Sequence, residues 1–504
     1  MRKLLPLFIL LFLFIACGSG ANETATREDI TAPSIPPAIS LIPIQPPPMP
    51  TPAPVPTPAP TPPPRPAPPP ITSLSHICDE ERETVICLLC AAELFAMMEA
   101  RLSWDGGEMW GVDLNGPFMF ADPVTRQAVA NRPAGQDRFE LVYQTEGVYA
   151  GELPSSVHIG NTAAIAHGIT WGMMTWSYVQ SILPDTERVV GIMAHELFHA
   201  WQPKLFTGRR PYWIPLNHMD GLNERISIWI ETTALIHALE TSGEERLQAV
   251  HTALSARAAR HESNPNALSA ETGFEISEGT ALYTEMRVIM NEMTDKIAWI
   301  RAHIDTHYIG KSLQGIGYVT GALYGLLLDA FEADWTTDFR WETDLGALLK
   351  ETAGIETLTP FAELDLTHYG YESIRAAETA WVEDNARRVD AIYALFEHPA
   401  LRLQHGGDFI ASDDGLYEYD VLSLPDISGN AAAFCGNIEY TGAFGRVVIT
   451  GGQLILGREP GFWEISAYGM EITETGATTP YWVLELNPGF RIIEERDGNF
   501  RIGR

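Results

Sequence analysis

Residues 190–203, VGIMAHELFHAWQP, decide both the fold and the chemistry expected of this chain. His195, Glu196 and His199 stand there among apolar side chains such as Leu197 and Phe198, in a run typical of one buried helix. Buried ionisable groups cost free energy unless they are paired or bind a metal ion. A helix places residues four apart on one face, so both imidazoles can hold one ion at about 2.1 Å. Glu196 is turned about 100° from His195, so it is free to act on water as a general base.

These three residues form an HExxH motif, which resembles the metal helix of zincin metallopeptidases. The cofactor that this resemblance implies is Zn²⁺. A catalytic zinc ion usually has three protein ligands and one open position, so a third ligand is needed. In one zincin subclass the motif continues as HExxHxxGxxH, but here Gln202 and Leu205 occupy the last two of those positions. We therefore expect the third ligand further along the chain.

Glu278 is the first candidate for the third ligand. Residues 277–283, SEGTALY, resemble the NEGxAxY segment of gluzincins, in which the glutamate binds zinc; Ser277 replaces the usual Asn. The resemblance implies that Glu278 is a metal ligand, 79 residues after His199. Gly279 is small, so we expect the metal helix to approach closely there. Glu275, three residues before Glu278, is expected on the same face of their helix.

Glu231 is the alternative third ligand. It lies in residues 228–235, IWIETTAL, where the apolar spacing predicts a buried helix face. A lone buried carboxylate would be unstable, so the competing interpretation pairs Glu231 with Arg257 or Arg260 on the next helix. The branched side chains after Glu231 also make the close approach of a metal helix harder.

The resemblance to gluzincins extends over residues 159–349. There the chain follows the order of loosely described bacterial HExxH proteins: HExxHxxQ, ETxAL, EGxAxYTE and GYxxGALxGLLLD. It implies a catalytic domain in which zinc-bound water, deprotonated by Glu196, attacks a peptide carbonyl. In gluzincins a Tyr or His of a later helix commonly donates to the oxyanion. Tyr318 is the first candidate by position, and Tyr283 and His307 are alternatives.

The N-terminal residues resemble the signal of a bacterial lipoprotein. Residues 1–17, MRKLLPLFILLFLFIAC, join a basic start to an apolar run and end in a lipobox-like FIAC. The resemblance implies cleavage before Cys17 and lipidation of Cys17. Residues 18–72 contain a proline tract, which predicts a semi-rigid, disordered linker. We therefore expect an extracytoplasmic protein held at the cell membrane by its lipid, with an uncleaved anchor or simple secretion as alternatives.

Charge and cysteine content narrow the possible partners. The formal net charge is −32 and no basic stripe is present, which argues against nucleic acid binding. Besides Cys17, the chain has Cys78, Cys87, Cys90 and Cys435. The CxxC of residues 87–90 lacks a partner pair, so we expect buried thiols or one disulfide among the first three rather than a zinc site.

The rest of the sequence predicts an α+β protein. Residues 73–398 form the expected metallopeptidase domain, with a helix over 81–101, short strands before the metal helix, and a mainly helical stretch from 223 to 399. A strand over residues 168–179 is expected beside the metal helix, where it either pairs with a peptide or belongs to the core. Residues 399–504 alternate in short runs and predict a small antiparallel β domain.

These features predict a zinc-dependent metallopeptidase-like hydrolase with a peptide or protein substrate. The alternative function is a catalytically weak binding lipoprotein with a zincin-derived fold. The intact general base at Glu196 favours the enzyme, because a binding protein does not need one. A solute-binding lipoprotein would need alternating βαβ units, and the long helical stretch lacks them.

Overall fold

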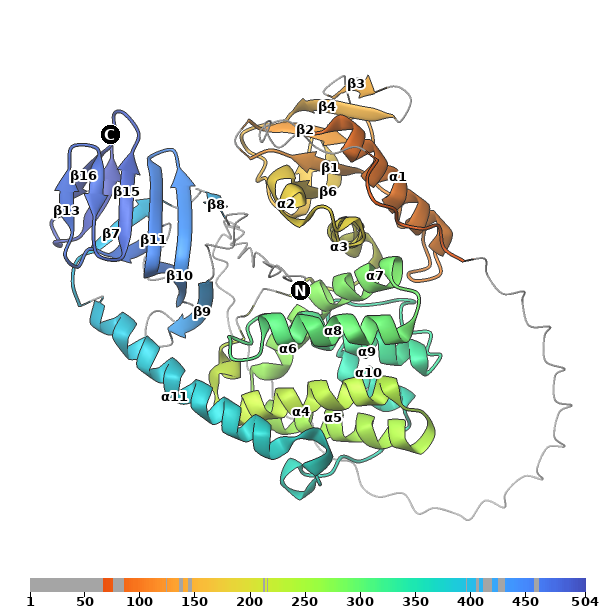
Figure 1. The fold of residues 1–504 in the computed structure, drawn as a ribbon. Coiled ribbons are helices and arrows are strands. Elements are labelled where there is room, and N and C mark those ends of the chain that lie inside the picture. Colours follow the sequence, from red (N-terminus) through yellow and green to blue (C-terminus); the bar gives the residue numbers. More distant parts are fainter. Residues whose placement is uncertain are drawn as a thin grey trace, which may run out of the picture. The chain divides into compact units, whose positions relative to one another are not determined.

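The computed structural model describes residues 67–75, 86–123, 125–135, 139–143, 147–211, 214, 216–395, 397–404, 408–410, 419–424, 431–456 and 462–504. The fold is α+β, as the sequence predicts (Figure 1). The expected signal peptide of residues 1–17, the lipidation site Cys17 and most of the proline-rich linker lie outside the described residues.

A six-stranded sheet precedes the metal helix. Its order is β3-β4-β2-β1-β6-β5; β1 and β6 run parallel and all other neighbours are antiparallel. The strands are β1 (Phe118–Ala121), β2 (Gln127–Ala130), β3 (Glu140–Tyr143), β4 (Val148–Glu152), β5 (Thr162–Ala166) and β6 (Ile169–Thr175). Three helices accompany this sheet: α1 (Leu88–Asp105), α2 (Trp176–Ile182) and α3 (Thr186–Leu205). α3 packs against β6 and β5, so the sheet supports the helix that carries HExxH.

The strand expected over residues 168–179 is shorter than predicted. β6 ends at Thr175, and Trp176 begins α2 with its ring buried against Phe120. β6 also lies inside the sheet, between β1, which pairs with residues 172–175, and β5, which pairs with residues 169–173. Among the described strands, the edge strand that contacts α3 is β5, whose Ile165 is 72% exposed.

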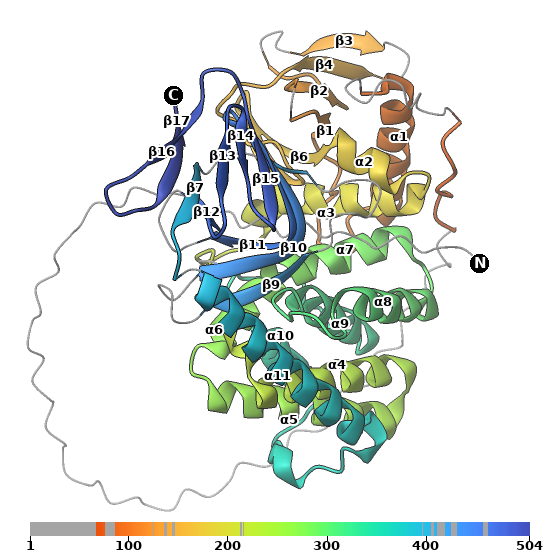
Figure 2. The same cartoon turned by 60° about the vertical axis from the view of Figure 1, so that its left-hand side comes forward.

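A helical region follows α3, as expected from residue 223 onward. It comprises α4 (Leu222–Glu240), α5 (Gly243–Ser263), α6 (Ala267–Phe274), a π-helix (Glu275–Gly279), α7 (Thr280–Ile289), α8 (Met293–His307), α9 (Gly317–Ala330), α10 (Leu345–Thr352) and α11 (Tyr371–Leu395). Short 3₁₀ turns occur at Asn217–Asp220, Phe361–Glu363 and Thr367–Tyr369. α7 packs against both α3 and α9, and Figure 2 shows it between them.

An aromatic cluster forms the core between α3 and α7. The Trp110 ring contacts Phe198 of α3 at a centroid distance of 4.8 Å and Tyr283 of α7 at 6.1 Å. The indole N–H of Trp110 donates to Thr284 Oγ1 at 3.0 Å, so its one polar atom is satisfied. This packing fixes the separation of the two helices on which the candidate site is built.

The turn at Glu275–Gly279 is wider than an α-helical turn, so α6, the π-helix and α7 follow one another as three separate elements. Ser242 is the N-cap of α5, and its side chain makes no capping hydrogen bond.

The C-terminal residues form an eleven-stranded sheet that begins at β7 (Ala400–Gln404). The other strands are β8 (Asp408–Ile410), β9 (Tyr419–Leu424), β10 (Ala431–Gly442), β11 (Gly445–Leu456), β12 (Phe462–Ser466), β13 (Glu471–Thr473), β14 (Gly476–Thr478), β15 (Trp482–Leu486), β16 (Arg491–Glu494) and β17 (Phe500–Gly503). All pairings are antiparallel except that of β17 with β7.

Cys87 and Cys90 form a disulfide at the start of α1, with Cα atoms 5.3 Å apart. This is one of the pairings left open by the sequence; Cys78 lies outside the described residues. The helix expected over 81–101 appears as α1 and runs on to Asp105. None of the helices in the described parts of the chain is long and apolar enough to cross a membrane.

Candidate metal centre

Helix α3 presents both histidines on one face. The Asp185 side chain caps its first turn by accepting from Arg188 N, Glu187 lies in that turn, and Lys204 lies in the last turn. These charges suit the helix dipole. The rings of His195 and His199 lie one turn apart, with centroids separated by 4.9 Å. The candidate site is therefore built on a regular, capped helix rather than on a loop.

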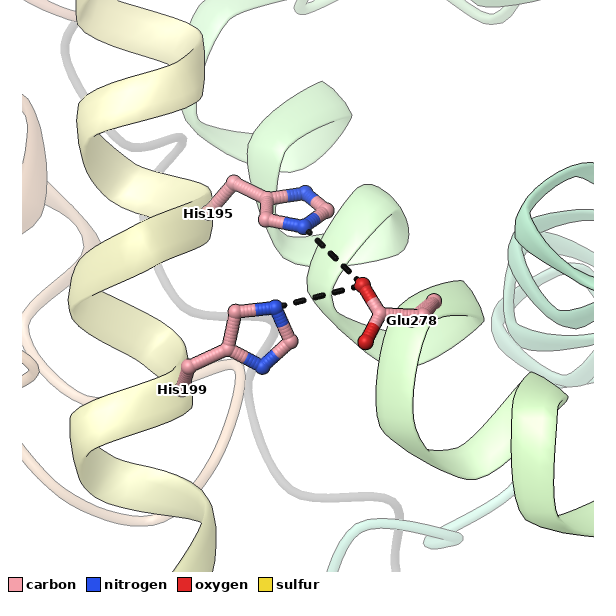
Figure 3. A group of neighbouring side chains, drawn as sticks. All are labelled: His195, His199 and Glu278. Carbon is pink, nitrogen blue, oxygen red and sulfur yellow. Dashed lines mark ion pairs between the residues drawn. The ribbon is translucent and has the colours of Figure 1, made fainter. Parts of the chain in front are cut away.

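The structure brings Glu278 to these two histidines (Figure 3). Glu278 Oε2 lies 3.3 Å from His199 Nε2 and 3.6 Å from His195 Nε2. One possible ligand atom from each residue falls within 4.8 Å of the others. Among the described residues, no other group of three or more His, Cys, Asp or Glu side chains meets at this spacing.

The π-helix explains how Glu278 reaches the histidines. The sequence predicted a shared face for Glu275 and Glu278, and the structure shows this to be wrong. Glu275 accepts two 2.8 Å hydrogen bonds from Arg257, whereas Glu278 turns towards α3. The wider π turn separates two side chains that an α-helix would place together.

Gly279 has a different role from the one expected. A side chain there would meet α9, not the metal helix, because its Cβ would lie 2.6 Å from Gly321 Cα and 2.7 Å from Gly317 O. The two backbones touch at this point. Gly279 therefore sets how closely the π-helix and α9 pack, and through that contact it sets the position of Glu278.

Glu196 lies beside the triad with its carboxylate free. It is 7% exposed, and no hydrogen bond holds its side chain in the described structure. Burial raises the pKa of Glu196 to about 7, against the opposing effect of the charges of His195 and His199. A carboxylate with a pKa near neutrality is well matched to general base catalysis.

Tyr318 of α9 also lies at the site. Its ring stacks on His195 at a centroid distance of 5.9 Å. Burial and the neighbouring Glu278 carboxylate hold the pKa of Tyr318 well above its usual value, so it remains an O–H donor. The alternative Tyr283 is turned away, because its hydroxyl donates to Asp329 at 2.8 Å. His307 lies on α8, with its ring centroid 4.5 Å from that of His303.

Two residues orient the histidines from behind. Gln202 Oε1 accepts from His199 Nδ1 at 2.9 Å, and its amide donates to Ser277 O at 2.6 Å. Glu285 Oε2 lies 3.3 Å from His195 Nδ1, at ion-pair distance. Both contacts leave Nε2 facing Glu278. Partners of this kind fix the tautomer and orientation of metal-binding histidines.

No role was predicted from the sequence for Gln202 or Glu285. Gln202 follows His199 by three residues on α3, a spacing that returns its side chain to the same helix face. Glu285 follows Glu278 across the end of the π-helix, so α-helical spacing could not place it.

Glu231 does not join the histidines. It is fully buried and accepts from Arg260 Nη2 at 2.5 Å and from Tyr324 O–H at 2.6 Å. Arg257 Nη1 lies 3.4 Å from Glu231 Oε1, the oxygen that accepts from Tyr324. The same arginines bind Glu271 and Glu275, so Glu231 belongs to a buried ion-pair network behind the π-helix. This is the arginine pairing that we predicted as the alternative to a ligand role for Glu231.

The donor set fits a zinc ion. Zinc accepts imidazole nitrogen and carboxylate oxygen, and bonds of 2.0–2.1 Å at tetrahedral angles separate ligand atoms by about 3.4 Å. The observed Nε2–Oε2 separations of 3.3 Å and 3.6 Å match that value. They are longer than ordinary hydrogen bonds of about 2.7–3.2 Å, so direct bonding between these side chains explains them less well.

Comparisons with known proteins return no relatives. No protein-family model matches the chain, and no curated protein or solved structure is significantly similar to it.

Proposed function

We propose that this protein is a zinc-dependent metallopeptidase-like hydrolase. The observation that carries the proposal is the convergence of His195, His199 and Glu278, with Glu196 free beside them. Three zinc-type donors and an adjacent base are the parts that metal-assisted hydrolysis needs. A bound zinc ion would supply Lewis-acid polarisation of a carbonyl and an acidified water.

The residues of the chain have separate roles in this proposal. Glu196 accepts the proton of the attacking water, and its raised pKa suits it to return that proton to the leaving amine. The Tyr318 hydroxyl donates a hydrogen bond to the oxygen on which charge develops. Gln202 and Glu285 keep the imidazole rings in the orientation that ligation requires.

A peptide is the substrate class that the surroundings favour. Strand β5 packs against α3, the helix that carries HExxH, and among the described strands it pairs only with β6, so its second edge offers backbone groups for pairing. An extended peptide can add to such an edge through main-chain hydrogen bonds. This arrangement of metal helix and edge strand supports a zincin-like catalytic domain, of the gluzincin type if Glu278 is the third ligand.

The site of action that we propose is the outer face of a bacterial cell membrane. The support is in the sequence: the lipobox-like end of residues 1–17, with lipidation at Cys17, and the proline tract that follows. A linker of this composition would hold the folded part away from the lipid surface.

The second candidate is a lipid-anchored binding protein with a zincin-like site and little turnover. Glu196 and Tyr318 distinguish a hydrolase from a binding protein, because neither side chain is needed to hold an ion or a peptide. Their presence next to the triad favours hydrolysis.

The test combines zinc content with peptide hydrolysis. The wild-type protein should purify with one zinc ion per chain and cleave members of a mixed peptide pool. His195→Ala should lose both properties. Glu196→Gln should keep zinc and lose activity by at least about 100-fold, the scale expected for removal of a general base.

Glu187→Gln is the matched control, since it removes an exposed carboxylate from the first turn of the same helix. Zinc binding without cleavage of any peptide would favour the binding protein. Full activity in Glu196→Gln would refute the proposed mechanism, and wild-type protein that binds no zinc would refute the proposed metal centre.

A further inference from the structure

The disulfide between Cys87 and Cys90 lies at the N-terminus of α1, and its two halves differ in accessibility. Cys87 is the N-cap residue of this 18-residue helix, and Cys90 lies in its first turn. Cys87 is partly exposed, whereas Cys90 is fully buried, with 0% of its surface exposed. A thiol from outside the protein can therefore approach the bond only on the Cys87 side.

This disulfide contributes little to holding the fold together. It closes a loop of residues 87–90 within the start of one helix and joins no second element to it. The stabilisation by a disulfide grows with the length of the loop that it closes, so so short a loop gains least. Packing holds α1 instead: Leu94 and Met98 are fully buried, and Phe95 stacks on Phe120 of β1 at a centroid distance of 5.1 Å. The bond can therefore open without loss of the fold.

The start of the helix also favours a negative charge on Cys87. The Cys87 sulfur accepts a hydrogen bond from the backbone N–H of Cys90 at 3.2 Å. This N–H is one of the donors that the first helical turn leaves unpaired, and the positive end of the helix dipole acts in the same direction. Helix N-termini stabilise cysteine thiolates in this way. Cys87 is therefore the sulfur that can leave, or attack, as a thiolate.

The charges along the start of α1 do not oppose this effect. Its first turn, residues 88–91, contains no acidic side chain. Glu93 lies beyond that turn, and its Oε2 accepts a hydrogen bond from the backbone N–H of Ser75 at 2.8 Å. The side chains next to Cys87 are the partly exposed Leu88 and Leu89, which offer an incoming partner an apolar contact.

We propose that Cys87 and Cys90 form a thiol–disulfide exchange site that accepts electrons from an external dithiol. One thiolate of the dithiol attacks the Cys87 sulfur, the Cys87–Cys90 bond breaks, and Cys90 leaves with the electron pair and takes up a proton. The second thiolate of the dithiol then attacks its own partner sulfur in the mixed disulfide, and Cys87 leaves as the thiolate that the helix stabilises. Two electrons thus pass to the protein, the dithiol becomes a disulfide, and its second proton goes to the solvent.

This inference goes beyond the proposed hydrolase and does not depend on it, because it uses no residue of the candidate metal centre. Disulfides persist in oxidising compartments, so the bond is compatible with the proposed location outside the cytosol. Exchange would make the oxidised and reduced proteins two forms that interconvert with the thiol supply around the cell.

The test uses the full chain with Cys17, Cys78 and Cys435 replaced by serine, so that only the two remaining thiols can react. The oxidised protein is equilibrated with excess reduced glutathione or with dithiothreitol, and free thiols are then trapped with iodoacetamide and counted by mass spectrometry. We expect glutathione to reduce more than half of the bonds at equilibrium, whereas structural disulfides of secreted proteins resist the glutathione pool. Helical circular dichroism should stay unchanged on reduction.

Two single variants in this background assign the sulfurs. With oxidised glutathione, Cys90→Ser should accumulate a mixed disulfide at Cys87, because no second thiol is left to displace the glutathione. Cys87→Ser is the matched control and should form at least about tenfold less, because Cys90 is fully buried.

Leu89→Lys and Leu89→Glu test the contribution of charge, since they replace the same first-turn side chain with opposite signs. With both cysteines present, Leu89→Lys should shift the equilibrium with glutathione about two- to fivefold towards the reduced protein. Leu89→Glu should shift it by a similar factor towards the disulfide.

Four outcomes would overturn the inference. The folded protein could stay oxidised in excess glutathione, or it could lose helical circular dichroism on reduction, and either result would make the bond structural. Equal mixed-disulfide formation in Cys90→Ser and Cys87→Ser would refute the roles of the two sulfurs. Equal shifts in Leu89→Lys and Leu89→Glu would refute stabilisation of the thiolate by the helix. Zinc content and peptide cleavage are separate measurements, so failure of the proposed hydrolase would leave the exchange site standing.

Discussion

Replacing Gly279 with alanine tests whether helix packing positions Glu278. The added Cβ would lie 2.6 Å from Gly321 Cα and 2.7 Å from Gly317 O, and both of the atoms that it meets are main chain. Carbon atoms normally pack at about 3.5 Å, so the π-helix and α9 must separate by about 0.9 Å. Overpacking of this kind costs about 1–3 kcal/mol. Because Glu278 immediately precedes Gly279, we also expect zinc affinity to fall by at least about tenfold.

Gly273→Ala is the matched control. Gly273 is six residues earlier in α6, and a Cβ there would make ordinary contact with Pro211 Cγ at 3.4 Å. This substitution should stabilise the protein by about 0.4–1 kcal/mol, because alanine restricts the unfolded chain. The two glycine-to-alanine changes should therefore shift the free energy of unfolding in opposite directions.

The assay measures the two effects separately. Urea unfolding of metal-free protein, followed by helical circular dichroism, gives the change in stability. Competition with a chromophoric chelator gives the zinc affinity of the folded protein. If Gly279→Ala were as stable as the wild type and bound zinc equally well, the contact with α9 would not position Glu278, and the reasoning would be refuted.

Three further predictions address the ligand, the ion-pair network and buried histidine. Glu278→Ala should purify largely without zinc but folded, as measured by metal analysis and circular dichroism; unchanged zinc content would exclude Glu278 as ligand. Glu231→Ala should keep zinc and lose about 3–5 kcal/mol in urea unfolding, because it leaves buried arginines unpaired; zinc loss with unchanged stability would contradict this. His303 has a folded pKa of about 3, below its unfolded value of 6.5, so its contribution is complete above pH 6.5 and decreases as the pH falls. Between pH 6.5 and 5 the wild type should therefore lose about 1.6 kcal/mol more than His303→Phe; equal losses in paired urea titrations would refute the burial effect.

The sequence predicted the helices of the candidate site better than their spatial relations. The HExxH motif in an apolar run was sufficient to predict α3, because the helical periodicity of buried residues can be recognised within a few adjacent residues. The prediction that Glu278 joins the histidines followed from the resemblance of residues 277–283 to a gluzincin segment, not from a physical argument. Spacing alone could not choose between Glu278 and Glu231, because both glutamates lie in apolar helical segments.

The errors have a common physical cause, which is contact between distant segments. The shared face expected for Glu275 and Glu278 assumed an α-helix, and no local pattern indicates a π turn. The close approach expected between Gly279 and the metal helix was assigned to the wrong partner, because α9 begins 38 residues later. The position of β5 as the edge strand that contacts α3 likewise depends on strand order, which the alternation of single strands does not encode.

The π-helix also makes the candidate centre sensitive to the number of residues and not only to their identity. A π turn accommodates an extra residue within an otherwise α-helical segment. Deleting one residue between Ile276 and Thr280 would restore an α-helix and rotate one end against the other by about 100°. Either Glu275 would lose Arg257 or Glu278 would lose the histidines. A related chain that aligns with a one-residue gap here could keep every recognisable side chain and still lack one of these two sets of contacts.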